Sequence, residues 1–204
     1  MMNLDNIVKS SKKKVKTIGV DVDNVLFRIP TIEYINSQFN TNYTYDDMKD
    51  WSFSNFPKDI QDEVFRAFRS PDFMCRTKPY WNNYCTLRDW HLEGHKIYAI
   101  TRRAFNLYNK TEQQILNHYP NIFQGMIFVK PNESKAKFLK GIDADIHIDD
   151  YDVEDSVMAG IETWLITNEE TKYNHHLRNN LGLNQAARLE YVKGVSRKDA
   201  KWLV

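Results

Sequence analysis

Two aspartates near the start of the chain have the spacing of a catalytic or metal-binding pair. Asp21 and Asp23 follow an apolar run, residues 15–20, that is typical of a buried strand. Alternate residues of a strand point to the same side, so the two carboxylates would share one side of the strand tip. At an effective dielectric constant of about 20, two charges ~4 Å apart repel by roughly 4 kcal/mol, which a cation would relieve. Oxygen ligands beside a phosphate-sized space favour Mg²⁺ and leave one carboxylate to attack phosphorus or to move a proton. The ordinary alternative is a helix cap or an Asx turn.

Three further strand-like segments are followed by polar residues that could join this pair. The segments are residues 96–100, 126–129 and 144–148. After them come, in chain order, Thr101 and Arg102, then Lys135, then Asp149 and Asp150. Open parallel α/β sheets bind their ligands at the carboxyl ends of their strands. We therefore predict that all of these residues meet at one site.

The order Asp-x-Asp, Thr, Lys, Asp-Asp resembles the four sequence motifs of the haloacid dehalogenase-like (HAD-like) phosphohydrolases. Within that superfamily the chain is most similar to the 5'(3')-deoxyribonucleotidases, from about residue 15 to about residue 176. Two residues depart from the family pattern. Asn24 stands where the family usually has Gly, and Asn tolerates the left-handed backbone that such a turn needs. Arg102 stands where the family usually has Ser, so only the role of its backbone N–H carries over, and the phosphate pocket is expected to be more cationic.

The resemblance implies the chemistry of a phosphatase. Asp21 would attack phosphorus and form an aspartyl phosphate, while Asp23 would protonate the leaving oxygen and later deprotonate the hydrolytic water. Thr101, the backbone N–H of Arg102 and Lys135 would bind the phosphoryl oxygens. Thr101 could instead cap a helix, and Lys135 could be a solvated helix lysine.

The resemblance also implies a Mg²⁺ site. Its ligands would be a carboxylate oxygen of Asp21, the backbone carbonyl of Asp23 and the carboxylate of Asp150, with Asp149 in a supporting role. Both members of the Asp149–Asp150 pair could instead cap the following helix. Two other residues remain open on sequence grounds: Arg103 is equally compatible with a phosphate contact and a surface charge. His147, within an apolar strand, fits a hydrogen-bonded structural histidine better than a ligand.

The chain divides into a core and an inserted lobe. We predict a loose basic N-terminus over residues 1–14 and a core formed by residues 15–28 and 79–204. The core resembles the HAD-like fold, which is an α/β fold with a Rossmann-like parallel sheet flanked by helices. Residues 29–78 interrupt its alternation of strands and helices and are predicted to form a small helical cap. Helical spacing is expected over residues 31–39, with Thr31 as N-cap, and 59–69 in the cap, and over 80–93, 106–119, 134–139 and 153–159 in the core. A fifth strand is expected at 163–166, and the tail from residue 171 is predicted to be helical and polar, with no legible role.

The cap bears on the substrate. A cap over the carboxyl ends of the strands encloses a small cavity, which favours small phosphomonoesters over phosphoproteins. Trp51 and Phe73 could stack a nucleobase, or they could belong to the core of the cap. We therefore expect a phosphatase for (deoxy)nucleoside monophosphates. The alternatives are a phosphatase for polynucleotide ends or another small phosphometabolite, and a non-catalytic phosphate-binding module, which would have no use for the nucleophile Asp21.

Composition excludes several other classes. The chain has 204 residues with 28 basic and 27 acidic ones, and its net charge of +1 gives no field for a stable nucleic-acid complex. No apolar run approaches ~18 residues, so we expect no membrane span. No apolar signal segment begins the chain, and the two cysteines, Cys75 and Cys85, form no CxxC pair, so we expect a cytoplasmic protein with reduced thiols. The sequence leaves open whether the protein is a homodimer.

Overall fold

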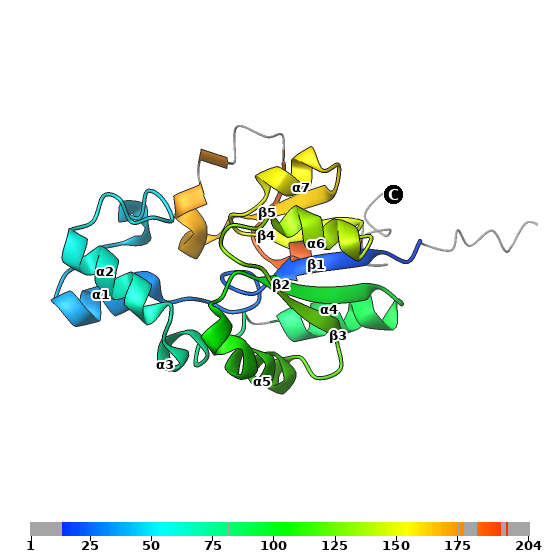
Figure 1. Cartoon of the computed structure of the whole chain (residues 1–204), viewed down its shortest axis with the longest axis horizontal. Helices are drawn as coiled ribbons and strands as arrows, with labels where there is room; N and C mark the ends of the chain where they lie inside the picture. The colour runs from blue at the N-terminus through cyan, green and yellow to red at the C-terminus, as the bar shows by residue number, and fades with distance from the viewer. Residues whose placement is uncertain (1–13, 81, 175, 178–182, 193–194, 196–204) are drawn as a thin grey trace, which may run out of the picture.

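The computed structural model describes residues 14–80, 82–174, 176–177, 183–192 and 195 (Figure 1). The predicted loose N-terminus, residues 1–14, lies outside this part except for Lys14. The described strands form one sheet in the order β3-β2-β1-β4-β5-β6, and every pair of neighbours is parallel. Their bounds are β1 Thr17–Asp21, β2 Lys96–Thr101, β3 Phe123–Phe128, β4 Ile146–Asp149, β5 Glu162–Ile166 and β6 Asn184–Ala186. The predicted α/β fold with a parallel sheet is confirmed.

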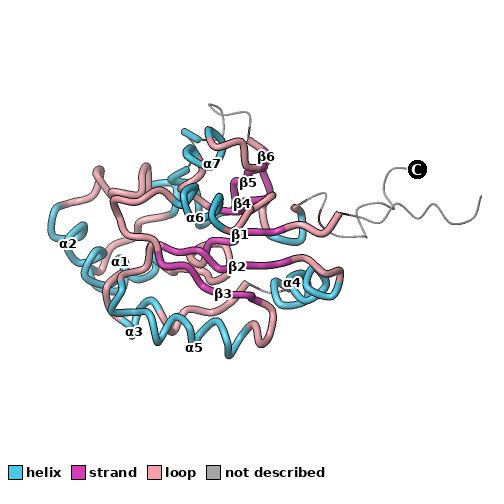
Figure 2. Tube along the Cα trace, turned by 45° about the vertical axis from the view of Figure 1, so that its right-hand side comes forward, coloured by secondary structure: helices cyan, strands magenta, loops and turns pink. Residues whose placement is uncertain are grey.

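The register of the central strands explains why the predicted site residues converge. β1 is bounded by β2 on one side and β4 on the other, with Val20 opposite both Ala99 and Ile148. Strands covered on both faces need apolar side chains on both, which accounts for the uninterrupted apolar runs in the sequence. Because the three strands end level with one another, the residues that close them lie along one edge of the sheet, and this edge faces the cap (Figure 2).

Helices cover both faces of the sheet (Figure 1). α4 (Asn83–Leu92) and α5 (Tyr108–His118) lie on one face, where Leu87 and Ile115 join the core around Ile18 and Val20. α6 (Lys135–Gly141) and α7 (Glu154–Met158) lie on the other. The expected helices 80–93, 106–119, 134–139 and 153–159 correspond to these four, with ends that differ by one to three residues.

Gly19 sets how closely α6 approaches β1. A Cβ atom at this position would lie 2.2 Å from Cδ2 of the buried Leu139, far inside van der Waals contact. The absence of a side chain at residue 19 therefore lets α6 pack directly on β1. This packing brings the first residue of α6, Lys135, to the end of β1.

The segment predicted as a cap, residues 29–78, forms a lobe beyond the carboxyl ends of the strands (Figures 1 and 2). It contains α1 (Thr31–Phe39), the 3₁₀ helix η2 (Tyr45–Asp47), α2 (Lys58–Ala67) and α3 (Pro71–Met74). The lobe has its own apolar cluster, which includes Ile35, Phe53 and Val64, and Tyr173 joins this cluster from the core. The predicted N-cap role of Thr31 is wrong, because Pro30 precedes the helix and Thr31 is its first residue, with no side-chain capping bond.

In its described residues the tail differs from its prediction, and residues 175, 178–182, 193–194 and 196–204 lie outside the described part of the chain. Residues 184–186 form the edge strand β6, which pairs with β5, and 3₁₀ helices occupy Glu169–Asn174 (η4) and Leu189–Tyr191 (η5). A strand of three residues, Asn-Gln-Ala, carries no apolar alternation, so only its pairing with β5 makes it a strand.

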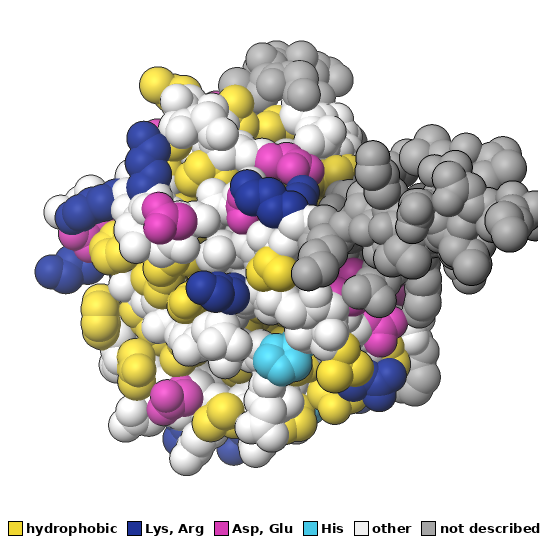
Figure 3. All heavy atoms as spheres, turned by 90° about the vertical axis from the view of Figure 1, so that its right-hand side faces the viewer, with side chains coloured by type: hydrophobic (Ala, Val, Ile, Leu, Met, Phe, Trp, Pro, Cys, Tyr) yellow, Lys and Arg dark blue, Asp and Glu magenta, His cyan; other side chains and the backbone are white. Residues whose placement is uncertain are grey.

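No helix in the described part of the chain is long and apolar enough to cross a membrane. On the face turned away from the cap, basic and acidic side chains are interspersed over the described surface (Figure 3).

Candidate active site

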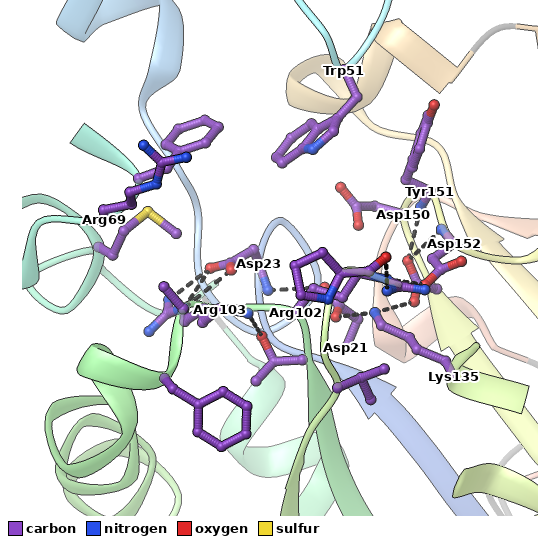
Figure 4. Close-up of a pocket in the computed structure, with 18 of the residues that line it drawn as sticks. Asp21, Asp23, Trp51, Arg69, Arg102, Arg103, Lys135, Asp150, Tyr151 and Asp152 are labelled. Carbon is purple, nitrogen blue, oxygen red and sulfur yellow. Dashed lines mark hydrogen bonds and ion pairs between the residues drawn. The ribbon is translucent and has the colours of Figure 1, made fainter. Parts of the chain in front are cut away.

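A cavity of about 590 Å³ lies between the carboxyl edge of the sheet and the cap (Figure 4). Its sheet side carries the motif residues and its cap side carries aromatic rings. Of the residues predicted from sequence, it is lined by Asp21, Asp23, Trp51, Thr101, Arg102, Lys135, Asp149 and Asp150. Phe73 is the predicted site residue that does not line it. Residues from five separate segments of the chain therefore meet at one cavity.

Lys135 connects two of the aspartates. Its Nζ lies 2.5 Å from Oδ1 of Asp21 and 2.6 Å from Oδ2 of Asp149. The side chain of the preceding Ser134 accepts a hydrogen bond from the N–H of Ala136, which caps α6 and fixes its first turn. Lys135 is 3% exposed, so it is a buried partner of the carboxylates and not a solvated helix lysine.

The carboxylates exceed the cations that compensate them. Burial raises the pKa of Asp21 to about 8, the charges of Asp149 and Asp23 add to this effect, and Lys135 opposes it. Burial, with the charges of Asp21 and Asp149, also raises the pKa of Asp150 well above its ordinary value. Burial alone would raise the pKa of Asp149 too, but Lys135 and His147 hold it well below its usual range. Lys135 is therefore the one cation shared by three buried carboxylates, Asp21, Asp149 and Asp150.

Asp21, Asp149 and Asp150 form a group that could hold a metal ion, since one carboxylate oxygen from each lies within 4.8 Å of the others. An all-oxygen set with surplus negative charge fits Mg²⁺. Asp149 is anchored by the protein, because its Oδ1 accepts hydrogen bonds of 2.9 Å from the N–H groups of Tyr151 and Asp152. Those bonds favour the supporting role that the resemblance implies for Asp149.

Asp150 is held through one of its oxygens. The hydroxyl of Tyr173 donates to its Oδ2, and Nδ2 of Asn24 lies 3.5 Å from the same oxygen. Asn24 has a φ of 55°, the left-handed conformation expected at this turn. Its side chain also donates to Tyr173 (2.9 Å) and accepts from the N–H of Ile29 (3.0 Å), contacts that the usual Gly could not make.

Asp23 faces a different partner, Arg103. Nη2 of Arg103 lies 2.7 Å from Oδ1 of Asp23, and Nε lies 3.0 and 3.1 Å from its two oxygens (Figure 4). The Arg103 side chain is completely buried, so Arg103 is not the surface charge left open on sequence grounds. Nothing in the sequence around Arg103 marks this pairing, because it joins residues 80 positions apart; a phosphate contact of Arg103 stays a prediction.

Thr101 and Arg102 close β2 in different ways. Oγ1 of Thr101 accepts from the N–H of Arg103 (3.1 Å), which leaves its hydroxyl hydrogen available to donate into the cavity. Thr101 caps no helix, since the next one, η3 (Phe105–Leu107), follows Ala104. The guanidinium of Arg102 pairs with Asp152 (2.6 Å) and donates to the carbonyls of Lys130 and Pro131. Its charge is therefore paired within the protein, which corrects the expectation of a more cationic phosphate pocket.

The cap wall is aromatic, with one change from the prediction. Trp51 stacks on Phe68 with ring centroids 5.4 Å apart and lines the cavity together with it. Phe73 lies outside the cavity lining. Its ring centroid is 4.7 Å from that of Tyr34 and 6.1 Å from that of Phe68. The sequence does not single out Phe68, which falls in the expected helix 59–69, because helical spacing does not tell a core ring from a cavity ring. His147 is fully buried in β4 with Nε2 3.1 Å from Oδ2 of Asp149, although the contact lacks hydrogen-bond geometry.

Comparison with known families decides the affiliation. The family model described as "5' nucleotidase, deoxy (Pyrimidine), cytosolic type C protein" matches residues 14–189. The chain belongs to this family. The match covers the sheet, the cap and every site residue named above. A search of curated proteins finds no match.

Solved structures agree at the level of the fold. A hydrolase of the haloacid dehalogenase-like family from Streptococcus pneumoniae is 16% identical, with a TM-score of 0.59 over 86% of this chain and 96% of that one. A HAD family hydrolase from Deinococcus radiodurans, with bound phosphate and sodium, is 12% identical, with a TM-score of 0.57 over 85% and 90%. CbbY from Rhodobacter sphaeroides, in complex with phosphate, is 11% identical, with a TM-score of 0.55 over 89% and 99%. This 5' nucleotidase family member therefore has the HAD-like fold that its motifs indicate.

Proposed function

We propose that this protein is a cytoplasmic, Mg²⁺-dependent phosphatase that hydrolyses (deoxy)nucleoside monophosphates through a phosphorylated Asp21. The observation that carries the proposal is the juxtaposition in one cavity of Asp21 and its buried Lys135 with the Trp51–Phe68 stack of the cap. The first pair suits phosphoryl transfer and the second suits a flat base. Membership of the nucleotidase family supports the same substrate class.

The chemistry starts at Asp21. Its carboxylate attacks phosphorus, a bond forms between the carboxylate oxygen and phosphorus, and the bond to the sugar oxygen breaks. Lys135 and the Thr101 hydroxyl face the phosphoryl oxygens and stabilise their charge. The backbone N–H of Asp23 donates to Oδ2 of Asp21 (3.0 Å), which orients the nucleophile.

Asp23 acts as the general acid and then as the general base. Its carboxyl gives a proton to the departing sugar oxygen, and the resulting carboxylate takes one from the water that then attacks phosphorus. Phosphate and Asp21 are released by that second attack. Mg²⁺, when bound by Asp21, Asp150 and the backbone carbonyl of Asp23, would neutralise charge on the phosphate and on the carboxylate cluster.

The cavity fits a nucleotide in size and chemistry. Its volume of about 590 Å³ lies within the roughly 300–1,000 Å³ of small-molecule sites. Base stacking on aromatic side chains is worth about 1–3 kcal/mol per base in single-strand binders. A base against Trp51 would leave the sugar and phosphate to span the distance to Asp21.

The decisive experiment measures Mg²⁺-dependent phosphate release. The panel comprises deoxy- and ribonucleoside 5'- and 3'-monophosphates, sugar phosphates and 3'-phosphorylated oligonucleotides, with the Asp21→Asn variant as the blank. We expect the highest kcat/KM on a nucleoside monophosphate. A preference for oligonucleotide ends or for sugar phosphates would replace the proposed substrate class, and release that persists in the Asp21→Asn variant would reject the phosphorylated Asp21.

A further inference from the structure

We infer that Arg103 is a positioning residue that sets the orientation in which Asp23 exchanges protons with the substrate. The inference rests on the proposed function, because it concerns the acid/base step of that reaction. Three observations carry it: the burial of the arginine, the division of its N–H groups between Asp23 and fixed partners, and the unequal use of the two oxygens of Asp23.

Burial separates the roles of the two residues. The side chain of Arg103 is 0% exposed, whereas that of Asp23 is 16% exposed and lines the cavity. The guanidinium carbon of Arg103 also lies 5.9 Å from the centre of the Phe27 ring. Arg103 borders the cavity as well, but none of its side chain is exposed, so Asp23 is the member of the pair whose carboxylate a substrate can contact.

The guanidinium of Arg103 is also held by two residues other than Asp23. Its Nη1 lies 2.8 Å from Oε1 of Gln114 and 3.2 Å from Oγ1 of Thr111, two buried residues of α5. Gln114 is oriented in turn, because its Nε2 donates to both the carbonyl and the hydroxyl of Thr77 at 3.0 Å. Since the planar guanidinium has a rigid fork of donors, fixing Nη1 also fixes the direction of Nε and Nη2.

The two oxygens of Asp23 are used unequally. Oδ1 accepts from both Nε and Nη2, at 3.0 and 2.7 Å, whereas Oδ2 has only the longer contact of 3.1 Å with Nε. An ionised carboxylate has about four acceptor positions, so Oδ2 keeps the greater free capacity. Oδ2 is therefore the oxygen that Arg103 leaves to exchange the proton with the leaving group and the water.

A leaving-group comparison tests this role. A nucleoside monophosphate expels a sugar alkoxide that needs a proton, whereas p-nitrophenyl phosphate expels a phenolate that needs little help. General acid catalysis contributes about 10²–10⁴-fold, so we expect Arg103→Met to lower kcat on the nucleotide by roughly 10²-fold and to lower kcat on p-nitrophenyl phosphate much less. Arg103→Lys should restore part of the loss. Arg66→Met, which removes an exposed arginine paired with Glu63, is the matched control and should leave both rates unchanged.

A double mutant separates positioning from a direct contact with substrate. If Arg103 acts through Asp23, adding Arg103→Met to Asp23→Asn should change kcat by less than about threefold, because the two residues work as one unit. Equal losses on both substrates, together with losses that multiply in the double mutant, would overturn the inference. If Arg103→Met does not fold, Gln114→Met loosens the guanidinium without removing the ion pair, and a smaller loss with the same substrate dependence is expected.

A crystal structure of the variant gives a result that does not depend on turnover. Positioning requires the carboxylate of Asp23 to rotate or to become disordered in Arg103→Met or Gln114→Met. A carboxylate that keeps its orientation would overturn the inference whatever the substrate. If the wild-type protein releases phosphate from no nucleotide, the proposed function fails, and the position of Asp23 in the variant still decides what Arg103 does.

Discussion

At the scale of single residues, charge explains the arrangement of the site. Each cation on the sheet side of the cavity has a carboxylate partner: Lys135 pairs with Asp149 and Asp21, Arg103 with Asp23, and Arg102 with Asp152. A dianionic phosphate would add to a cluster in which Asp21, Asp149 and Asp150 share Lys135 and the pKa values of Asp21 and Asp150 are raised. A divalent cation would offset this charge, which supports the proposed Mg²⁺ dependence on grounds separate from the family resemblance.

Asp21→Asn tests the nucleophile at this scale. The amide nearly preserves the shape of the side chain and removes the attacking oxygen, so we expect phosphate release to fall to less than ~1% of wild type, since uncatalysed phosphate-monoester hydrolysis is extremely slow. The melting temperature, measured in the same buffer with Mg²⁺, should show that the variant is folded. Activity of several per cent in a variant shown by mass spectrometry to be free of deamidation would contradict a covalent Asp21 intermediate.

At the scale of elements, the 3₁₀ helix η4 connects the cap to Asp150, one of the carboxylates proposed to bind the metal. Its Tyr173 packs in the apolar cluster of the cap, contacts the Trp51 ring at 5.2 Å between centroids, and donates its hydroxyl to Asp150. One side chain therefore touches both the wall expected to hold the base and the carboxylate expected to hold the metal.

Tyr173→Phe should weaken Mg²⁺ binding. The ring and its packing remain, but Asp150 loses the hydroxyl that orients it, and loss of such supporting hydrogen bonds typically costs 10- to 100-fold in metal affinity. Isothermal titration with Mg²⁺ alone measures the effect. Tyr119→Phe removes another buried tyrosine hydroxyl, bonded to the carbonyl of Leu26 outside the site, and should leave affinity unchanged. Equal affinity in the two variants would show that Tyr173 does not orient Asp150.

The cap wall offers a second matched pair, Trp51 and Phe73. Trp51 lines the cavity and Phe73 does not. Loss of one stacking ring, at about 1–3 kcal/mol, should raise KM for a deoxynucleotide by about five- to hundredfold in Trp51→Ala. KM for a sugar phosphate should change less, and Phe73→Ala should affect both substrates only through stability, which thermal melting reports. A uniform effect of Trp51→Ala on all substrates would place this ring in the core of the cap alone.

Local patterns and long-range pairings differ in how far the sequence predicts them. Asp21, Thr101, Lys135 and Asp150 each stand at or near the end of an apolar strand, so local order together with the parallel-sheet rule is enough to bring them together. The pairs Arg103–Asp23 and Tyr173–Asp150 join residues 80 and 23 positions apart and leave no periodic signal. The cavity position of Phe68 is likewise not legible in the sequence, because helical spacing gives the face of a helix and not what lies opposite it.

At the scale of the whole molecule, folding buries carboxyl groups whose charge needs a proton or a cation for balance. Asp21 and Asp150 are almost fully buried beneath the cap, and their pKa values are raised in the folded state. The unfolded chain carries both groups at their ordinary pKa. We therefore expect stability to depend on pH, and on Mg²⁺ as well if the proposed metal site is correct.

The direction of the pH dependence of stability follows from the pKa of Asp21, which is about 8 in the folded protein against an ordinary value of 3.8. Below about pH 4 this carboxyl is protonated in both states. Between about pH 4 and pH 8 the folded protein keeps a proton that the unfolded chain has released, so stability falls as pH rises, by up to ~1.4 kcal/mol per pH unit for each such carboxyl. Asp150 acts in the same direction. Asp149, whose pKa is lowered, contributes stability that is lost only below about pH 4, outside this window.

Mg²⁺ should reverse this loss, because a bound cation stabilises the ionised carboxylates. We therefore expect the melting temperature in EDTA to fall between pH 5.5 and pH 8, and the increase in melting temperature on adding Mg²⁺ to be larger at pH 8 than at pH 5.5. Differential scanning calorimetry at both pH values measures the two quantities. The Asp150→Asn variant, which removes one buried charge, should show a shallower dependence in EDTA and a smaller response to Mg²⁺. An equal Mg²⁺ response at the two pH values would mean that the metal does not bind the buried carboxylates, and the metal site would then have to lie elsewhere.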